Sequence, residues 1–157
     1  MKEVKTKPTI KNKFKMSVPA RSVNEAFART VVSAFVAQLD PTVEEINDIK
    51  AAVSEAVTNC IVHAYSGGEY SDTIGVIELE AKIMSDDTVY IRVRDKGCGI
   101  ADISQAKLPL FTTCVEGERA GLGFAVMESF MDKLKVSSKV GKGTTVTMTK
   151  RLVTKHE

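Results

Sequence analysis

EAVTNCIVH, residues 55–63, is the stretch that decides the fold of this chain. Its Glu55, Asn59 and His63 are spaced by four, so on a helix their side chains lie nearly one above another and drift by only about 40° per step. The neighbouring positions of the same helix are largely apolar. A polar line on an apolar helix suggests one wall of a binding site, although an isolated Glu and Asn could also form the wet side of a surface helix.

A second stretch, DKGCG at residues 95–99, places an aspartate before two glycines at alternate positions. Glycine allows the backbone to approach a ligand closely and to adopt φ values that are closed to other residues. The pattern predicts a loop built around a ligand, and an ordinary tight turn or a calcium-type turn stays possible for this stretch taken alone.

The residue types of these two stretches fit a magnesium-nucleotide pocket. An Asn oxygen is a neutral hard ligand that suits Mg²⁺, which keeps several waters and relies on substrate phosphates for the rest of its shell. Glu55, one turn earlier, could accept a proton from an attacking hydroxyl or water. His63 taken alone is more typical of a packing residue than of a catalyst.

Two further glycines indicate a phosphate-binding site at the start of a helix. Gly121-Leu122-Gly123 opens a predicted helix, and a helix N-terminus with glycines suits an anion. The chain has no G-x-G-x-x-G after a strand, and Gly141-Lys142-Gly143-Thr144 lacks the P-loop pattern. Rossmann and P-loop folds are therefore disfavoured.

Hydrophobic periodicity predicts an alternation of strands and helices around these stretches. Phe14, Met16 and Val18 alternate as in a half-buried strand that Pro19 ends. A helix follows from Ser22, with Glu25 as capping-box partner and Phe27, Val31, Ala34, Phe35 and Leu39 as its buried side. A second helix is predicted to start after Thr42 and to end at Ser66-Gly67-Gly68. Two hairpins are predicted, one from residues 74–83 and 89–94 and the other from residues 134–137 and 144–149.

The chain's length and composition fit a single domain. We expect residues 14–153 of the 157 to form it, with residues 1–13 as a mobile, lysine-rich tail. A net charge of +2 gives little support for nucleic-acid binding, and three widely spaced cysteines support neither a disulfide framework nor a zinc site. The sequence has no apolar signal region and no stretch long enough to span a membrane, so we expect a cytoplasmic protein without membrane contact.

The order of signals, E-x-x-x-N, D-x-G-x-G, a long lid and a G-x-G helix start, resembles the GHKL family of ATP-binding domains. A narrower likeness, to the anti-sigma F factors of spore-forming bacteria, rests on runs such as Ala20–Arg29, Phe35–Thr42 and Pro109–Thr113 and extends from about Phe14 to Arg151. The resemblance implies an α/β sandwich in which helices cover one face of a mixed, mostly antiparallel sheet.

The resemblance also implies a role for individual residues. Glu55 matches the general base, Asn59 the magnesium ligand, and Asp95 the aspartate that binds the adenine amino group. The other matches are Gly97 and Gly99 in the base pocket, Arg119 near the γ-phosphate, Gly121 and Gly123 at the phosphates, Thr144 on the adenine side, and Arg29 on the partner-binding surface.

The implied activity is that of a serine kinase that uses ATP and Mg²⁺ to phosphorylate an anti-anti-sigma factor. As a homodimer in its ATP-bound form, the same protein would bind and inhibit the sporulation sigma factor F. Two alternatives share the same pocket: a general-stress anti-sigma-B-type kinase, and a nucleotide-gated binding module without kinase activity.

Two features depart from the family pattern. Ala64 stands where a glycine is common after the histidine, and Cys60 and Cys114 occupy unexpected positions. None of these residues belongs to the implied set of ATP ligands.

Overall fold

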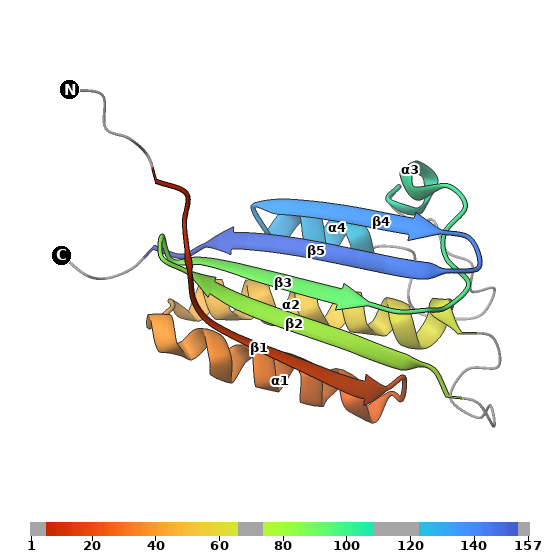
Figure 1. The fold of residues 1–157 in the computed structure, drawn as a ribbon, viewed down its shortest axis with the longest axis horizontal. Coiled ribbons are helices and arrows are strands. Elements are labelled where there is room, and N and C mark those ends of the chain that lie inside the picture. The colour runs from red at the N-terminus through yellow and green to blue at the C-terminus, as the bar shows by residue number, and fades with distance from the viewer. Residues whose placement is uncertain (1–5, 66–73, 109–122, 154–157) are drawn as a thin grey trace.

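A computed structural model describes residues 6–65, 74–108 and 123–153 as two layers, a five-stranded sheet and the helices that cover one of its faces (Figure 1). The strands are β1 (Ile10–Pro19), β2 (Val76–Met84), β3 (Thr88–Arg94), β4 (Lys133–Lys139) and β5 (Gly143–Arg151). Their order across the sheet is β1-β2-β3-β5-β4, and each of these neighbouring pairs is antiparallel. The predicted α/β sandwich with a mostly antiparallel sheet is confirmed.

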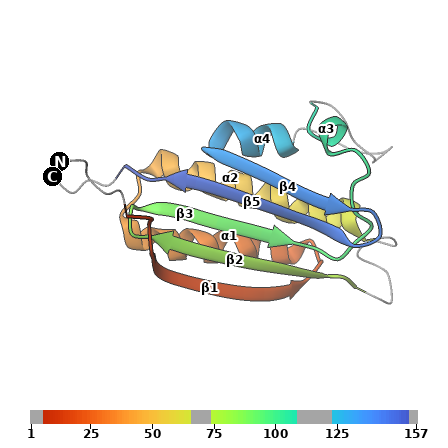
Figure 2. The same cartoon turned by 45° about the horizontal axis from the view of Figure 1, so that its top comes forward.

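The longer helices all pack on the same face of the sheet, as the tilted view in Figure 2 shows. The helical segments are α1 (Val23–Val36), the 3₁₀ turn η1 (Ala37–Leu39), α2 (Val43–Asn59), the π-helical turn η2 (Cys60–Ala64), α3 (Ile103–Ala106) and α4 (Gly123–Phe130). Within the described ranges, none of them is long and apolar enough to cross a bilayer.

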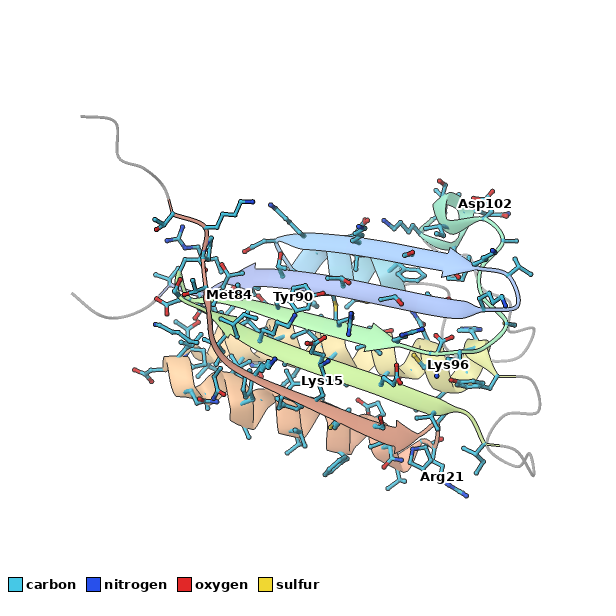
Figure 3. All side chains as sticks on the ribbon, viewed as in Figure 1. Lys15, Arg21, Met84, Tyr90, Lys96 and Asp102 are labelled. Carbon is cyan, nitrogen blue, oxygen red and sulfur yellow. The ribbon has the colours of Figure 1, made fainter. Side chains whose placement is uncertain are left out.

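The core lies between the sheet and these helices because side chains alternate along each strand. In β3, Val89, Ile91 and Val93 are buried toward α2, while the residues between them face the other way. Lys15 and Tyr90 project from the uncovered face of the sheet (Figure 3). The two predicted hairpins are present, with the turn of the first at Ser85, Asp86 and Asp87.

Strand β1 begins at Ile10, earlier than the alternation at residues 14–18 indicated. Ile10, Asn12 and Lys13 pair with Met84, Ile83 and Lys82 of β2, so residues 10–13 belong to the sheet and not to a mobile tail. The early part of the strand is exposed and lysine-rich because it lies at the sheet edge, where one side of the strand meets water.

Helix α1 differs from its prediction in two ways. Ser22 precedes the helix, but its side chain does not accept the capping hydrogen bond. The buried line runs through Ala28, Val32 and Val36 instead of Phe27, which is 52% exposed. Small and β-branched side chains occupy this line because α1 packs closely against both the sheet and α2.

Helix α2 starts with a capping box that also fastens the end of the last strand. Thr42 Oγ1 accepts a hydrogen bond from the Glu45 backbone N–H (3.1 Å), and Glu45 Oε2 accepts one from the Thr42 N–H (2.8 Å). Glu45 Oε1 accepts a third hydrogen bond from the N–H of Val153 (2.7 Å). Burial disfavours the charge on Glu45, but the hydrogen bonds from Val153 and Thr42 outweigh burial and hold its pKa below the ordinary value.

We predict that Glu45→Gln lowers the free energy of unfolding at neutral pH by about 1–2 kcal/mol, because an amide offers one acceptor oxygen where the carboxylate uses two. Since the folded-state pKa of Glu45 is depressed, its contribution is complete above the unfolded-state pKa, about 4.3, and is lost as the pH falls through the folded-state pKa. Urea unfolding from pH 3 to pH 7 should therefore show a difference from wild type that shrinks in acid. The exposed neighbour Glu44→Gln is the control, expected to stay within about 0.5 kcal/mol of wild type; an equal effect of both changes would contradict the role of Glu45.

Candidate functional site

A cavity of about 290 Å³ lies between the end of α2, the loop after β3, and the start of α4. Its walls combine apolar surface with polar side chains that come from separate elements, as is typical of small-molecule sites. The apolar part includes Ala56, Ala64, Ile100, Ala106, Phe124 and Val146, and the polar part includes Asn59, Cys60, His63, Asp95, Asp102, Gln105 and Thr144.

Asp95 stands directly after β3 and is only 5% exposed. Its Oδ1 accepts hydrogen bonds from the N–H of Gly97 (2.9 Å) and from the N–H of Thr144 (3.2 Å). The backbone N–H of Asp95 donates to the carbonyl of Thr144 (2.9 Å). These bonds join the end of β3 to the start of β5 and place a carboxylate in the cavity wall.

The glycines after Asp95 are required by close backbone contacts. A Cβ on Gly97 would lie 1.9 Å from the carbonyl oxygen of Ala64, and the N–H of Cys98 donates to that oxygen (2.6 Å). Gly99 has φ +75°, in the left-handed region, and a Cβ there would lie 2.3 Å from the carbonyl oxygen of Lys139. The loop is therefore packed between η2 and the β4–β5 turn, with close backbone contact at both glycines.

Thr144 lines the cavity on the β5 side, next to Asp95. Its hydroxyl forms a hydrogen bond with the hydroxyl of Ser138 (2.8 Å), which also accepts from the N–H of Ile100 (2.8 Å). Ser138 thus connects the β4–β5 hairpin to the loop after β3. The sequence analysis did not single out Ser138, because nothing in its local pattern distinguishes it from an ordinary strand serine.

Glu55 and Asn59 come together at the start of α4. A Cβ built on Gly123, the first residue of α4, would lie 3.1 Å from Glu55 Oε2 and 3.2 Å from Asn59 Oδ1. The first N–H groups of a helix lack intrahelical partners, so the start of α4 supplies donors beside these two oxygens. The predicted grouping of Glu55, Asn59 and Gly123 is therefore present in the structure.

His63 lies beyond the point where the α-helical spacing holds. Helix α2 ends at Asn59 and continues as the wider π-helical turn η2, which contains His63. The side chain still lines the cavity, and burial lowers the pKa of His63, which favours the neutral imidazole at physiological pH.

Cys60 lines the cavity beside Asp95 and is a site residue that the sequence analysis noted without assigning it a role. Its thiol is 4% exposed, and Sγ lies 3.4 Å from the Ala56 carbonyl oxygen and 3.6 Å from Asp95 Oδ2. Burial, and next the charge of Asp95, raise the pKa of Cys60 well above its ordinary value, so the thiol keeps its proton.

Three further residues were predicted to contribute to function. Arg119 and Gly121 lie outside the described residues. Arg29 is on α1, which contributes none of the described residues that line the cavity, and its Nε lies 3.5 Å from Oε1 of Glu25. Among the described residues, no group of three or more His, Cys, Asp and Glu side chains could hold a metal ion.

Comparison with known proteins agrees with this geometry. The model of the family described as "Histidine kinase-like ATPase domain" matches residues 18–150. An anti-sigma F factor from Caldanaerobacter subterraneus subsp. tengcongensis is 57% identical over 139 residues, which cover 88% of this chain and 93% of the relative. An anti-sigma F factor from Geobacillus kaustophilus is 50% identical over 143 residues, which cover 91% and 94%. The chain therefore belongs to the histidine kinase-like ATPase family and, within it, to the anti-sigma F factors.

Solved structures support the fold. The RsbU and RsbW domains of a Mycobacterium tuberculosis protein match with a TM-score of 0.63 and 22% identity, over 90% of this chain and 32% of that one. The histidine kinase domain of a blue-light activated histidine kinase from Erythrobacter litoralis matches with a TM-score of 0.54 and 22% identity, over 86% and 62%. The predicted family is confirmed, and with it a histidine kinase-like ATPase domain.

We predict that Gly97→Ala damages the site more than Gly141→Ala does. The first change forces a Cβ against the Ala64 carbonyl, whereas Gly141 has φ +76° and open space around it, so alanine there costs only backbone strain of about 1–2 kcal/mol. Thermal unfolding and calorimetric titration with ATP should show a larger loss for Gly97→Ala, with binding weakened about tenfold or more. Equal losses in both variants would contradict the close packing of the loop against η2.

Proposed function

We propose that this protein is an ATP-dependent serine kinase that phosphorylates an anti-anti-sigma factor and that, as a homodimer in its ATP-bound form, binds and inhibits sigma factor F. The observation that carries the proposal is the position of Glu55 beside Asn59 and Gly123, because these last two residues line the same pocket as Asp95. The names of the relatives, anti-sigma F factors at 50–57% identity, support the choice of partner.

The Asp95 side of the pocket fits an adenine base. Asp95 Oδ1 is occupied by two backbone N–H groups, while Oδ2 is an acceptor for the exocyclic amino group of the base. Ala64, Ile100 and Val146 provide apolar walls for the ring, and the cavity volume of about 290 Å³ is at the lower end of small-molecule sites. Gly97, Gly99 and Thr144 keep the loop and strand in place around it.

The Glu55 side of the pocket fits the triphosphate and its metal. Asn59 offers one neutral oxygen, as suits Mg²⁺, which takes most of its shell from water and phosphates. When bound, Mg²⁺ neutralises negative charge on the phosphates. The N–H groups at the start of α4 face the same place, and we propose that Gly121 and Arg119 contribute there as well.

Glu55 is the group that we propose as general base. Its carboxylate lies next to Asn59 through the common contact with Gly123, and a carboxylate there can accept the proton of an incoming serine hydroxyl. Phosphoryl transfer asks a protein chiefly for positioning and charge stabilisation, which Glu55, Asn59 and the α4 N-terminus supply from rigid elements.

Arg29 is proposed as part of the partner-binding surface. Its side chain is 43% exposed on α1 and is oriented by Glu25, so a guanidinium faces solvent away from the cavity. Capture of a general-stress sigma factor in place of sigma factor F would favour the anti-sigma-B-type alternative. Nucleotide binding without any phosphoserine on the substrate would favour a binding module.

We predict that Glu55→Ala abolishes phosphate transfer while ATP affinity changes less than about threefold, because Glu55 acts on the acceptor hydroxyl and not on the nucleotide. Asp95→Asn should instead weaken ATP binding about tenfold or more, because one donor group would then face the amino group of the base. The measurements are transfer from radiolabelled ATP to the anti-anti-sigma factor and calorimetric titration. Equal loss of binding in both variants would refute the role given to Glu55.

Asn59→Ala should remove most of the magnesium dependence of ATP binding. In the wild type we expect the affinity for ATP to rise with Mg²⁺. In the variant we expect the ATP-binding curves measured with Mg²⁺ and with a chelator to approach each other, because the side-chain ligand of the metal is lost. Asn12→Ala, on exposed β1, is the matched amide control and should keep the wild-type response. An unchanged magnesium response of Asn59→Ala would rule out Asn59 as ligand.

A further inference from the structure

The carboxylate of Asp95 has an unusual third partner in this chain. Its Oδ1 accepts hydrogen bonds from the N–H groups of Gly97 and Thr144, whereas Oδ2 of the same side chain lies 3.6 Å from the thiol of Cys60. Cys60 and Asp95 are 4% and 5% exposed, so little water reaches this contact. The thiol is a donor toward the oxygen that is left for a ligand.

The Cys60 thiol has one proton and two acceptors within hydrogen-bond distance. Its Sγ lies 3.4 Å from the Ala56 carbonyl oxygen and 3.6 Å from Oδ2 of Asp95, and the carboxylate is the stronger acceptor because it is charged. The Cys60 Cα is fixed by the last turn of α2 and the first residue of η2, and its Sγ also contacts the Ala56 carbonyl. The thiol is thus held where its proton can be donated to Oδ2 of Asp95.

We propose that Cys60 is a positioning residue for base recognition: its thiol orients Oδ2 of Asp95 and so strengthens the preference for a purine with an amino group over one with a carbonyl at the same ring position. This inference rests on the proposed function, because it concerns how the ATP pocket reads its base. The neighbouring Oδ1 is already fixed by two N–H groups, so a second anchor on Oδ2 fixes the whole carboxylate.

The physical reason is the cost of an incompletely paired buried carboxylate. Without the thiol, Oδ2 would lose a charge-assisted partner in a site of low exposure, and water or a rotated carboxylate would take its place. Either change reduces the binding free energy that is gained when the amino group of the base meets Oδ2. A carbonyl at that position meets Oδ2 as acceptor against acceptor in both cases, so its weak binding should change little.

The test compares ATP with inosine triphosphate, which carries a carbonyl where adenine carries the amino group. With the full chain in Mg²⁺, Cys60→Ala should bind ATP about threefold to tenfold more weakly, while its affinity for inosine triphosphate stays within about twofold, so the preference falls. Cys60→Ser keeps a hydroxyl donor and should retain most of the wild-type preference. Loss of preference in Cys60→Ala with rescue in Cys60→Ser supports the proposal.

Two controls separate positioning from packing. Val57→Ala removes buried volume from the same helix without touching the cavity, so it should lower the unfolding temperature but leave the preference unchanged. In an Asp95→Asn background, Cys60→Ala should no longer alter the preference, because the two changes act through one contact. An unchanged preference in Cys60→Ala alone, or an effect that persists in Asp95→Asn, would overturn the proposal.

The same titrations distinguish this proposal from the proposed function. A wild type that binds ATP and prefers it, with no effect of Cys60→Ala, would overturn only the role of the thiol. A wild type that binds neither nucleotide would overturn the proposed function and the role of Cys60 together.

Discussion

The rest of the site depends on the hydrogen bonds that surround the Asp95 carboxylate. A charge that is 5% exposed is stable only when donors surround it, and here the donors come from the loop after β3, from β5 and from α2's continuation. The same three segments line part of the cavity, together with residues of α2, α3 and α4. The hydrogen bonds to the carboxylate therefore join several of the segments that form the pocket.

Much of the fold was accessible from local patterns. The hairpins follow from alternation and turn residues, and the start of α2 follows from Thr42 and the acidic residues after it. The buried side of α1 was predicted only in part: Phe35 and Leu39 pack against the core, but the fully buried line runs through Ala28, Val32 and Val36. That helix contacts both the sheet and α2, so its largest apolar residues do not mark its innermost line. The predicted capping box between Ser22 and Glu25 does not form, because tertiary contacts engage the Glu25 side chain. Glu25 accepts a hydrogen bond from Ser54 and lies near Arg29.

The site was predictable only where sequence spacing fixes geometry. Glu55 and Asn59 are one helical turn apart, and Asp95 is followed by glycines, so these residues could be singled out. The sequence could not identify Phe124, Ser138 and Gln105 as site residues. They belong to the site only because the fold brings separate elements together around the cavity. The π-helical turn at Cys60–Ala64 was equally hidden, since no residue in it differs from those of an ordinary helix end.

The pairing of β3 with β5 has a consequence for how this architecture can diversify. The segment between Asp95 and Thr144 contributes α3, α4 and the edge strand β4, and the backbone and side-chain bonds between Asp95 and Thr144 hold its two ends together. Changing the length of a loop with a fixed stem is cheap, since each doubling costs only about 0.6 kcal/mol. Changes of length in the connections of this segment can therefore be accommodated while the pairing of β3 with β5 keeps its register.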